Sequence, residues 1–300
     1  MNNDYAIKTE GLTKFYGNFQ ALFGVDLEVQ QGEIFGFLGP NGAGKTTTIR
    51  CMLDTIHRSG GDVSILGVDP KEDPVSVRKM VGYLPGELNL DSSTTGEKLL
   101  RFFNSMRGGK ADWTYVEALA AKLELDIKRP IKNLSHGNKQ KIGVIQAFMH
   151  RPELVILDEP TQGLDPLMQR EVLNLLKDMK SAGATVFFSS HIMGEVQAIA
   201  DRVGIIREGR IVELAEPRSL IKRSLNRAFV RFKKPVDTAD LDAIPGVSVL
   251  ASDDGMEVTL QIEGEMDAVL KAVAKHPVSE FETERPSLEE IFLAYYEGGN

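Results

Sequence analysis

Short apolar runs, separated by turns that contain glycine, fill the N-terminal part of the chain. Val25, Leu27 and Val29 alternate with polar residues, which is the spacing of a half-buried strand. The segments "YAIKTEGLTKFYG", "ALFGVDLEVQQG" and "EIFGFLG" therefore predict strands, and the last of them is short and buried. The segment "KTTTIRCMLDTI" predicts a helix that starts after Gly44.

Helical spacing of apolar residues prevails from about residue 95 to residue 151, for example in "EKLLRFFNSM" and "VEALAAKLEL". Strands and helices then alternate: "ELVILDEP" and "ATVFFSS" predict buried strands, "HIMGEVQAIA" a helix and "RVGIIREGRIVELA" a hairpin. Between the two strands lies a helix with Asp165 as N-cap, Pro166 in the first position and Gly183 after its end. Such alternation implies parallel strands joined by crossover helices.

The pattern changes again after "EPRSLIKRSLN". From about Arg227 the chain reads as strand, helix, two strands, helix, strand and helix, with a hairpin turning at Asp254 and Gly255. A capping box from Ser287 to Glu290 marks the last helix. These residues predict a small separate domain, in which we find no catalytic constellation.

Composition and charge narrow the function classes. The net charge of -8 argues against a free-standing nucleic-acid binder, which usually carries a basic excess. The single cysteine, Cys51, excludes an intramolecular disulfide. No apolar run approaches the roughly 20 residues that cross a bilayer, and the first residues lack a secretory signal. We therefore expect a cytoplasmic protein, and if it acts at a membrane, another chain must span it.

The stretch "GPNGAGKT", residues 39–46, matches the phosphate-loop pattern G-x-x-x-x-G-K-[ST] between a predicted strand and a predicted helix. Its glycines let backbone N–H groups face phosphate oxygens, and the helix N-terminus adds a favourable dipole. Lys45 can reach the β- and γ-phosphates, and Thr46 can ligate Mg²⁺. A glycine-rich turn that binds nothing would explain the glycines but not Lys45 followed by Thr46.

Two carboxylates follow the buried run of residues 154–157. Asp158 stands at the end of this predicted strand, where it can hold Mg²⁺ through water, and Glu159 can orient and polarise an attacking water. Two solvated charges at a strand end are the alternative. In a chain with a phosphate loop, the functional interpretation is favoured.

The signature stretch, "LSHGNKQK" at residues 134–141, is polar and runs directly into an apolar helix. A loop or a helix cap would explain Ser135, Gly137 and Asn138. A bound phosphate would explain them too, because a helix cap and an anion site use the same groups.

Taken in order, "GPNGAGKTT", "LSHGNKQK", "LVILDEP", "GLD" and "SSH" resemble the motifs of the ATPase subunit of ABC transporters. The resemblance covers roughly residues 4 to 222. It implies an α/β fold of the P-loop NTPase class, the ABC ATPase fold, with a RecA-like core, an N-terminal antiparallel β subdomain and a helical subdomain at about residues 95–151. The ATPase domain would occupy residues 1–222, and a small C-terminal α+β accessory domain residues 223–300.

The resemblance also implies a set of ATP-binding residues. They are Tyr16, stacked on adenine, and the phosphate loop, Gly39, Pro40, Asn41, Gly42, Ala43, Gly44, Lys45, Thr46 and Thr47. Ser135 and Gly137 would contact the γ-phosphate of ATP held by a second ATPase domain, and Asp165 would lie at the interface between the two. Tyr16 could instead pack on the sheet, and Asp165 is also a good helix cap.

The catalytic residues that the resemblance implies are Glu159 and His191. His191 follows "VFFSS" and matches a histidine that contacts the γ-phosphate and positions Glu159. A lone histidine at a strand end is more often structural, so its place in the series of motifs carries this prediction.

The chain departs from the family pattern at two places. His136 and Asn138 replace a usual glycine and glutamine in the signature stretch. After "YLP", Gly86 stands where the family usually has a glutamine that serves Mg²⁺ and water. We hypothesise that Glu87, the next residue, replaces that glutamine as a metal ligand beside Thr46 and Asp158.

The resemblance thus predicts an ATPase that needs ATP and Mg²⁺ and pairs with a second ATPase domain. It also predicts that this ATPase powers polytopic membrane permease subunits and is located on the cytoplasmic face of the cell membrane. The P-loop sequence and the C-terminal domain resemble subunits of ABC-2-type exporters. The alternative is a soluble ABC-type ATPase that acts on ribosomes or DNA, although such members usually carry two cassettes or long coiled coils. A P-loop kinase would leave the signature stretch unexplained.

Overall fold

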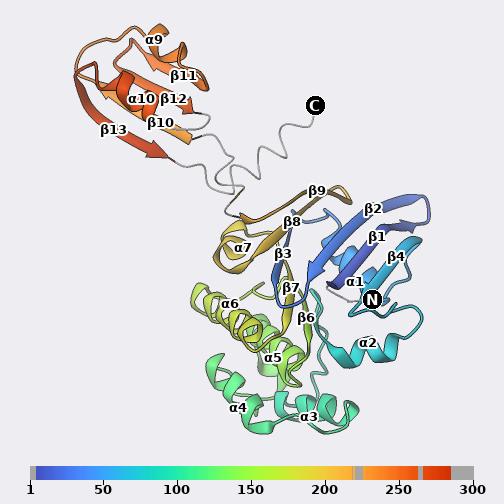
Figure 1. Ribbon diagram of the computed structural model, residues 1–300. Helices are drawn as coiled ribbons and strands as arrows, with labels where there is room; N and C mark the ends of the chain where they lie inside the picture. The colour runs from blue at the N-terminus through green and yellow to red at the C-terminus, as the bar shows by residue number, and fades with distance from the viewer. Residues whose placement is uncertain (1–4, 218, 220–225, 263–265, 285–300) are drawn as a thin grey trace. The chain divides into compact units, whose positions relative to one another are not determined.

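The computed structural model describes residues 5–217, 219, 226–262 and 266–284 (Figure 1). The chain divides into two compact units, Met1–Ala215 and Glu216–Asn300, and each is described by itself. The domain boundary expected at residue 222 and the helix expected at residues 287–296 lie outside the described residues.

A six-stranded sheet forms the centre of the first unit, in the order β5-β6-β7-β3-β8-β9. The pairs from β5 to β8 are parallel, and β9 runs antiparallel to β8. The strands are β3 (Ile34–Leu38), β5 (Val81–Leu84), β6 (Leu154–Asp158), β7 (Thr185–Ser190), β8 (Arg202–Arg207) and β9 (Arg210–Ala215). The parallel sheet and the terminal hairpin agree with the sequence pattern.

Three neighbouring strands of this sheet are buried along their whole length, because helices cover both faces of a parallel sheet. They are β6, β7 and β3. Their carboxyl ends lead into the phosphate loop, Asp158 and His191. Since parallel strands end at the same edge, these three groups converge there.

A second, antiparallel sheet covers part of this core, in the order β2-β1-β4. Its strands are β1 (Tyr5–Tyr16), β2 (Phe19–Gln30) and β4 (Gly60–Ile65). The predicted N-terminal β subdomain is therefore confirmed. The sequence pattern gave no prediction for β4, for β5, or for the helix α2 (Pro74–Met80).

The helices of the first unit include the predicted helical subdomain. They are α1 (Lys45–Met52), α3 (Gly96–Met106), α4 (Trp113–Lys122), a 3-10 turn (Ile131–Asn133), α5 (His136–Phe148), α6 (Pro166–Ser181) and α7 (Met193–Ile199). Both α3 and α4 contact α5 and lie at the bottom of this unit in Figure 1.

The second unit holds a four-stranded antiparallel sheet in the order β11-β12-β10-β13. Its elements are β10 (Asn226–Phe232), α9 (Ala239–Asp242), β11 (Val247–Asp253), β12 (Glu257–Ile262), α10 (Asp267–Val273) and β13 (Val278–Glu284). It has a hydrophobic core of its own. Asp254 and Gly255 turn the β11–β12 hairpin with φ of 44° and 68°, as their sequence predicts.

The described residues include no helix that is both long enough and apolar enough to cross a membrane.

Candidate functional site

The phosphate loop places a buried lysine at the end of β3. Gly44 caps α1 in the left-handed region with φ of 111°, a conformation that glycine adopts without strain. Lys45 begins the helix, and its Nζ donates to the carbonyls of Gly39 at 2.6 Å and Pro40 at 3.1 Å. Because the first N–H groups of a helix lack intrahelical acceptors, this loop presents donors and a cation to an anion.

Asp158 ends β6 and is fully buried. Its Oδ1 accepts a hydrogen bond from Ser189 Oγ at 2.6 Å, while its Oδ2 has no hydrogen-bond partner among the described residues. A buried carboxylate oxygen normally has a hydrogen-bond partner or coordinates a metal. Oδ2 therefore fits a hydrated Mg²⁺, whose preferred ligands are oxygens.

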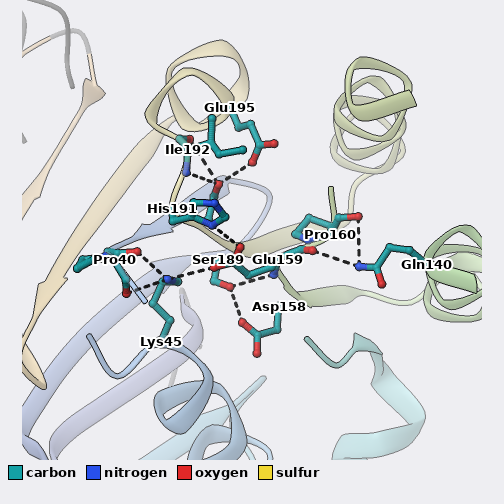
Figure 2. Close-up of polar contacts among 12 residues, drawn as sticks. Pro40, Lys45, Gln140, Asp158, Glu159, Pro160, Ser189, His191, Ile192 and Glu195 are labelled. Atoms are coloured by element: carbon teal, nitrogen blue, oxygen red, sulfur yellow. Dashed lines mark hydrogen bonds and ion pairs between the residues drawn. The ribbon is translucent and has the colours of Figure 1, made fainter. Parts of the chain in front are cut away.

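Glu159 is held by contacts to its backbone and to both carboxylate oxygens (Figure 2). It adopts a left-handed conformation, with φ of 53°, and its N–H donates to Ser189 Oγ at 3.1 Å. Oε1 lies 3.1 Å from Lys45 Nζ, and Oε2 lies 2.5 Å from His191 Nδ1. The structure thus brings the predicted Lys45, Glu159 and His191 together.

The loop that carries His191 is fixed by residues that the sequence pattern does not predict. Ser190 Oγ donates to Glu195 Oε2 at 2.6 Å and accepts from the Ile192 N–H at 2.9 Å. The Ser190 carbonyl accepts from the N–H of Gly39, which ties this loop to the phosphate loop. Ser190 directly precedes His191 in the motif "SSH", and this position is the sequence feature that indicates its role.

A cavity of about 470 Å³ opens in front of Lys45. It is lined by Tyr16, Phe19, Gln20, Ala21, Phe23, Pro40, Asn41, Gly42, Gly44, Lys45, Thr46, Thr47, Glu159, Glu208 and Gly209. The Tyr16 ring is half exposed, with Lys14 Nζ 5.0 Å from its centroid. The exposed Phe19 was not expected from the sequence. An aromatic surface and a phosphate loop in one cavity suit a nucleotide.

Three predicted nucleotide contacts lie outside the lining of this cavity. Ser135 caps α5 by accepting from the Asn138 N–H at 3.2 Å. Asp165 caps α6 through the N–H groups of Leu167 and Met168, both at 3.1 Å. Gly137 packs against the loop that leads to Asp165. Ser135 and Gly137, at the N-terminus of α5, are predicted to contact a γ-phosphate. Within the described residues, they do not line the cavity that contains Lys45.

The structure does not bring Glu87 into this cluster, since the residue is exposed. Gly86 lies there instead: a Cβ at this position would be 2.9 Å from Asp158 Oδ2. The absence of a side chain at Gly86 leaves room beside the carboxylate oxygen that fits Mg²⁺.

The partly buried Tyr83 and the buried Cys51 both have raised pKa values. Burial, together with the charge of Asp158, raises the pKa of Tyr83 to about 12. Burial also raises the pKa of the Cys51 thiol, on α1, to about 11. Neither group changes its charge near neutral pH.

Comparison with known proteins agrees with this geometry. The family described as ABC transporter matches residues 22–162, and the family described as ATP-binding protein DrrA1-3-like, C-terminal domain, matches residues 217–296. The chain is 37% identical to the bacitracin transport ATP-binding protein BcrA of Enterococcus faecalis, over 76% of this chain and 74% of the relative.

Two further similarities extend the match. The chain is 30% identical to the linearmycin resistance ATP-binding protein LnrL of Bacillus subtilis (strain 168), over 96% of this chain and 97% of the relative. Among solved structures, an ATP-binding subunit of an ABC transporter superposes with a TM-score of 0.66 at 29% identity, over 72% of this chain and 91% of the other.

Proposed function

The chain belongs to the ABC transporter ATP-binding proteins, and on this premise we propose that it powers an ABC-2-type exporter of drugs or antibiotics. It is the ATP-binding and ATP-hydrolysing subunit of such a transporter. Relatives whose names state bacitracin transport and linearmycin resistance support the choice of cargo class, as does the match of residues 217–296. The proposed location is the cytoplasmic face of the membrane.

The proposed site roles follow from the contacts around Glu159. The phosphate loop and Lys45 would bind the phosphates, and Thr46 and Asp158 would hold Mg²⁺, which when bound would supply positive charge to the transferring phosphate. Glu159 would accept a hydrogen bond from the attacking water, and His191 would contact the γ-phosphate. His191 Nδ1 lies 2.5 Å from the Glu159 carboxylate, whose other oxygen lies 3.1 Å from Lys45 Nζ. This geometry is the observation that carries the proposal.

A second ATPase domain completes the proposed site. Ser135 and Gly137 lie outside the cavity of their own Lys45, whereas a helix N-terminus with a hydroxyl and an approachable N–H suits a γ-phosphate. Two domains arranged head to tail would give each ATP the phosphate loop of one and the signature stretch of the other. ATP would hold this dimer together, and hydrolysis would release it.

We propose that the permease subunit docks at a groove of about 310 Å³ between the core sheet and the helical subdomain. Its largely apolar lining includes Leu53, Val81, Leu88, Leu90, Phe103 and Ile142. Leu53, Val81 and Ile142 are buried, whereas Phe102 and Met106, on α3 beside Phe103, are exposed. Exposed apolar side chains of this kind mark protein interaction surfaces.

Glu87 remains a proposed metal ligand that would need a loop shift to reach Asp158. The variant Glu87→Ala should weaken Mg²⁺-dependent hydrolysis. Normal Mg²⁺ affinity and normal hydrolysis in this variant would remove Glu87 from the site.

The first test measures ATP hydrolysis by the purified protein with and without Mg²⁺, together with nucleotide affinity. Lys45→Ala removes a cation that contacts the phosphates. Since a hydrogen bond to a charged group contributes about 1.5–3 kcal/mol, the Kd for ATP should rise about 10- to 150-fold. Undiminished ATP affinity in Lys45→Ala would contradict the assigned role.

The partner is tested by recovering the tagged protein from its native membranes in mild detergent, followed by mass spectrometry. Stoichiometric recovery of a polytopic membrane protein supports the exporter. Recovery with ribosomes or DNA factors alone would leave the ATPase chemistry intact and favour the alternative, a soluble ABC-type ATPase.

A further inference from the structure

A buried side-chain amide joins the signature helix to the backbone of Glu159. Gln140 lies on α5, just over one turn from Ser135, and is 2% exposed. Its Nε2 donates to the carbonyl of Glu159 at 3.1 Å and lies 3.4 Å from the carbonyl of Pro160 (Figure 2). None of the roles proposed above uses this residue.

The backbone of Glu159 needs such support. A residue with a side chain costs about 1–2 kcal/mol in the left-handed conformation, and Glu159 adopts it. Such conformations persist where the surroundings determine them. Here Ser189 Oγ binds the N–H of Glu159 and Gln140 binds its carbonyl, so the peptide units on both sides of its Cα are held.

The direction of the Glu159 side chain depends on these two hydrogen bonds. Once the backbone is fixed, its two carboxylate oxygens reach Lys45 Nζ and His191 Nδ1. A change at Gln140 would let the carbonyl turn and would move the carboxylate with it. The amide acts through the backbone and makes no contact with the reacting atoms.

We propose that Gln140 is a positioning residue that sets the conformation of Glu159 and links it to the signature end of α5. This inference rests on the proposed function. The N-terminus of α5 would contact the partner domain's ATP, and Gln140 is about one turn further along the same helix. Binding at one nucleotide site therefore aligns the water-orienting carboxylate of the other.

Two variants test the amide itself. Gln140→Met keeps the length and volume of the side chain but removes the donor. We expect kcat to fall by about 10- to 100-fold, because misplacing a reacting group by an ångström costs about that much, while the Kd for ATP stays at the parent value. The control is Gln197→Ala, at an exposed position of α7, which should hydrolyse ATP like the parent.

Gln140→Glu tests the hydrogen bond through the pH dependence of kcat, which a purely structural role would not change. A protonated carboxyl donates an O–H to the Glu159 carbonyl, whereas an ionised carboxylate repels it. The ratio of variant to parent kcat should therefore rise as the pH falls through the pKa of the introduced carboxyl. A ratio that stays at one at every pH overturns the proposal, and this variant also serves if Gln140→Met does not fold.

A double-mutant cycle separates this inference from the proposed function. In a Glu159→Gln background, adding Gln140→Met should lower the residual rate no further, because groups that act as a unit are not additive. A further loss equal to that in the parent would overturn the positioning role. If Glu159→Gln alone hydrolyses ATP like the parent, the proposed function fails. If Glu159→Gln is inactive but Gln140→Met is fully active, only this inference fails.

Discussion

At the residue scale, the proposed hydrolysis depends most on the carboxylate of Glu159. Its carboxylate lies against Lys45 and His191, and this pair of contacts leaves both oxygens engaged. ATP phosphates are stronger partners for Lys45 than a single carboxylate, since they carry more charge. We therefore expect bound ATP to take Lys45 from Glu159 and leave Oε1 to accept from water.

Tyr16 tests the nucleotide cavity. Stacking of a base on an aromatic ring contributes about 1–3 kcal/mol, so Tyr16→Ala should raise the Kd for ATP about 5- to 150-fold. Tyr16→Phe keeps the ring and should bind ATP like the parent. Fluorescence titration with a labelled ATP analogue measures both, and equal affinities of Tyr16→Ala and the parent would show that the ring packs on the protein instead.

The sequence predicts some site residues better than others. Lys45 and Thr46 follow from a local pattern in a recognisable context, and Asp158 and Glu159 follow from their place after a buried strand. Gln140 and Ser189 act through hydrogen bonds to residues 19 and 30 positions away. Such contacts depend on how the elements meet in space, which residue spacing does not encode.

At the element scale, the order of three strands builds the site. The strands β6, β7 and β3 are neighbours although they are far apart in the sequence. Their shared carboxyl edge places Asp158, His191 and the phosphate loop together. Long periodic segments such as α6 are predictable because several turns repeat one pattern, but β5, with four residues, is too short to do so.

The contact of β5 with α5 gives a prediction about stability. A Cβ at Gly82 would lie 2.1 Å from the Ala147 carbonyl oxygen, and overpacking of this kind costs about 1–3 kcal/mol. Gly82→Ala should therefore lower the melting temperature by several degrees. A Cβ added at Gly194, on α7, would have no heavy atom within 4 Å beyond its chain neighbours and the backbone of its own helix, so Gly194→Ala should stabilise the helix by up to about 1 kcal/mol.

Differential scanning calorimetry of both variants checks this contrast. Equal melting temperatures for Gly82→Ala and Gly194→Ala would mean that a methyl group at Gly82 fits between β5 and α5 without destabilising the protein. That result would contradict the close packing of these two elements.

At the scale of the whole molecule, each of the two compact units has a hydrophobic core among its described residues. One is built from the N-terminal strands and the central sheet, and the other from the strands and helices between residues 226 and 284. The order of the described elements from β10 to β13 follows from the sequence pattern, whereas β4, α2 and β5 of the first unit do not. No sequence motif indicates the function of the C-terminal unit, because the core residues that its pattern reveals are apolar and pack against one another.

Two cores predict two unfolding transitions. Only the first unit has the phosphate loop, so ATP should raise one melting temperature and leave the other unchanged. A ligand at 100 times its Kd stabilises its domain by about 2.7 kcal/mol. Calorimetry with and without ATP measures this, and a single transition that shifts as a whole would mean that the units unfold together.

The most direct test of the ATP-driven dimer is light scattering of Glu159→Gln with ATP and Mg²⁺ during size-exclusion chromatography, beside a hydrolysis assay. Removing a water-orienting base lowers turnover by about 10²- to 10⁴-fold. The variant should therefore bind ATP, hydrolyse it very slowly and elute as a dimer, while the same protein with ADP elutes as a monomer. A Glu159→Gln protein that stays monomeric with ATP, or that hydrolyses ATP at the parent rate, would contradict the account.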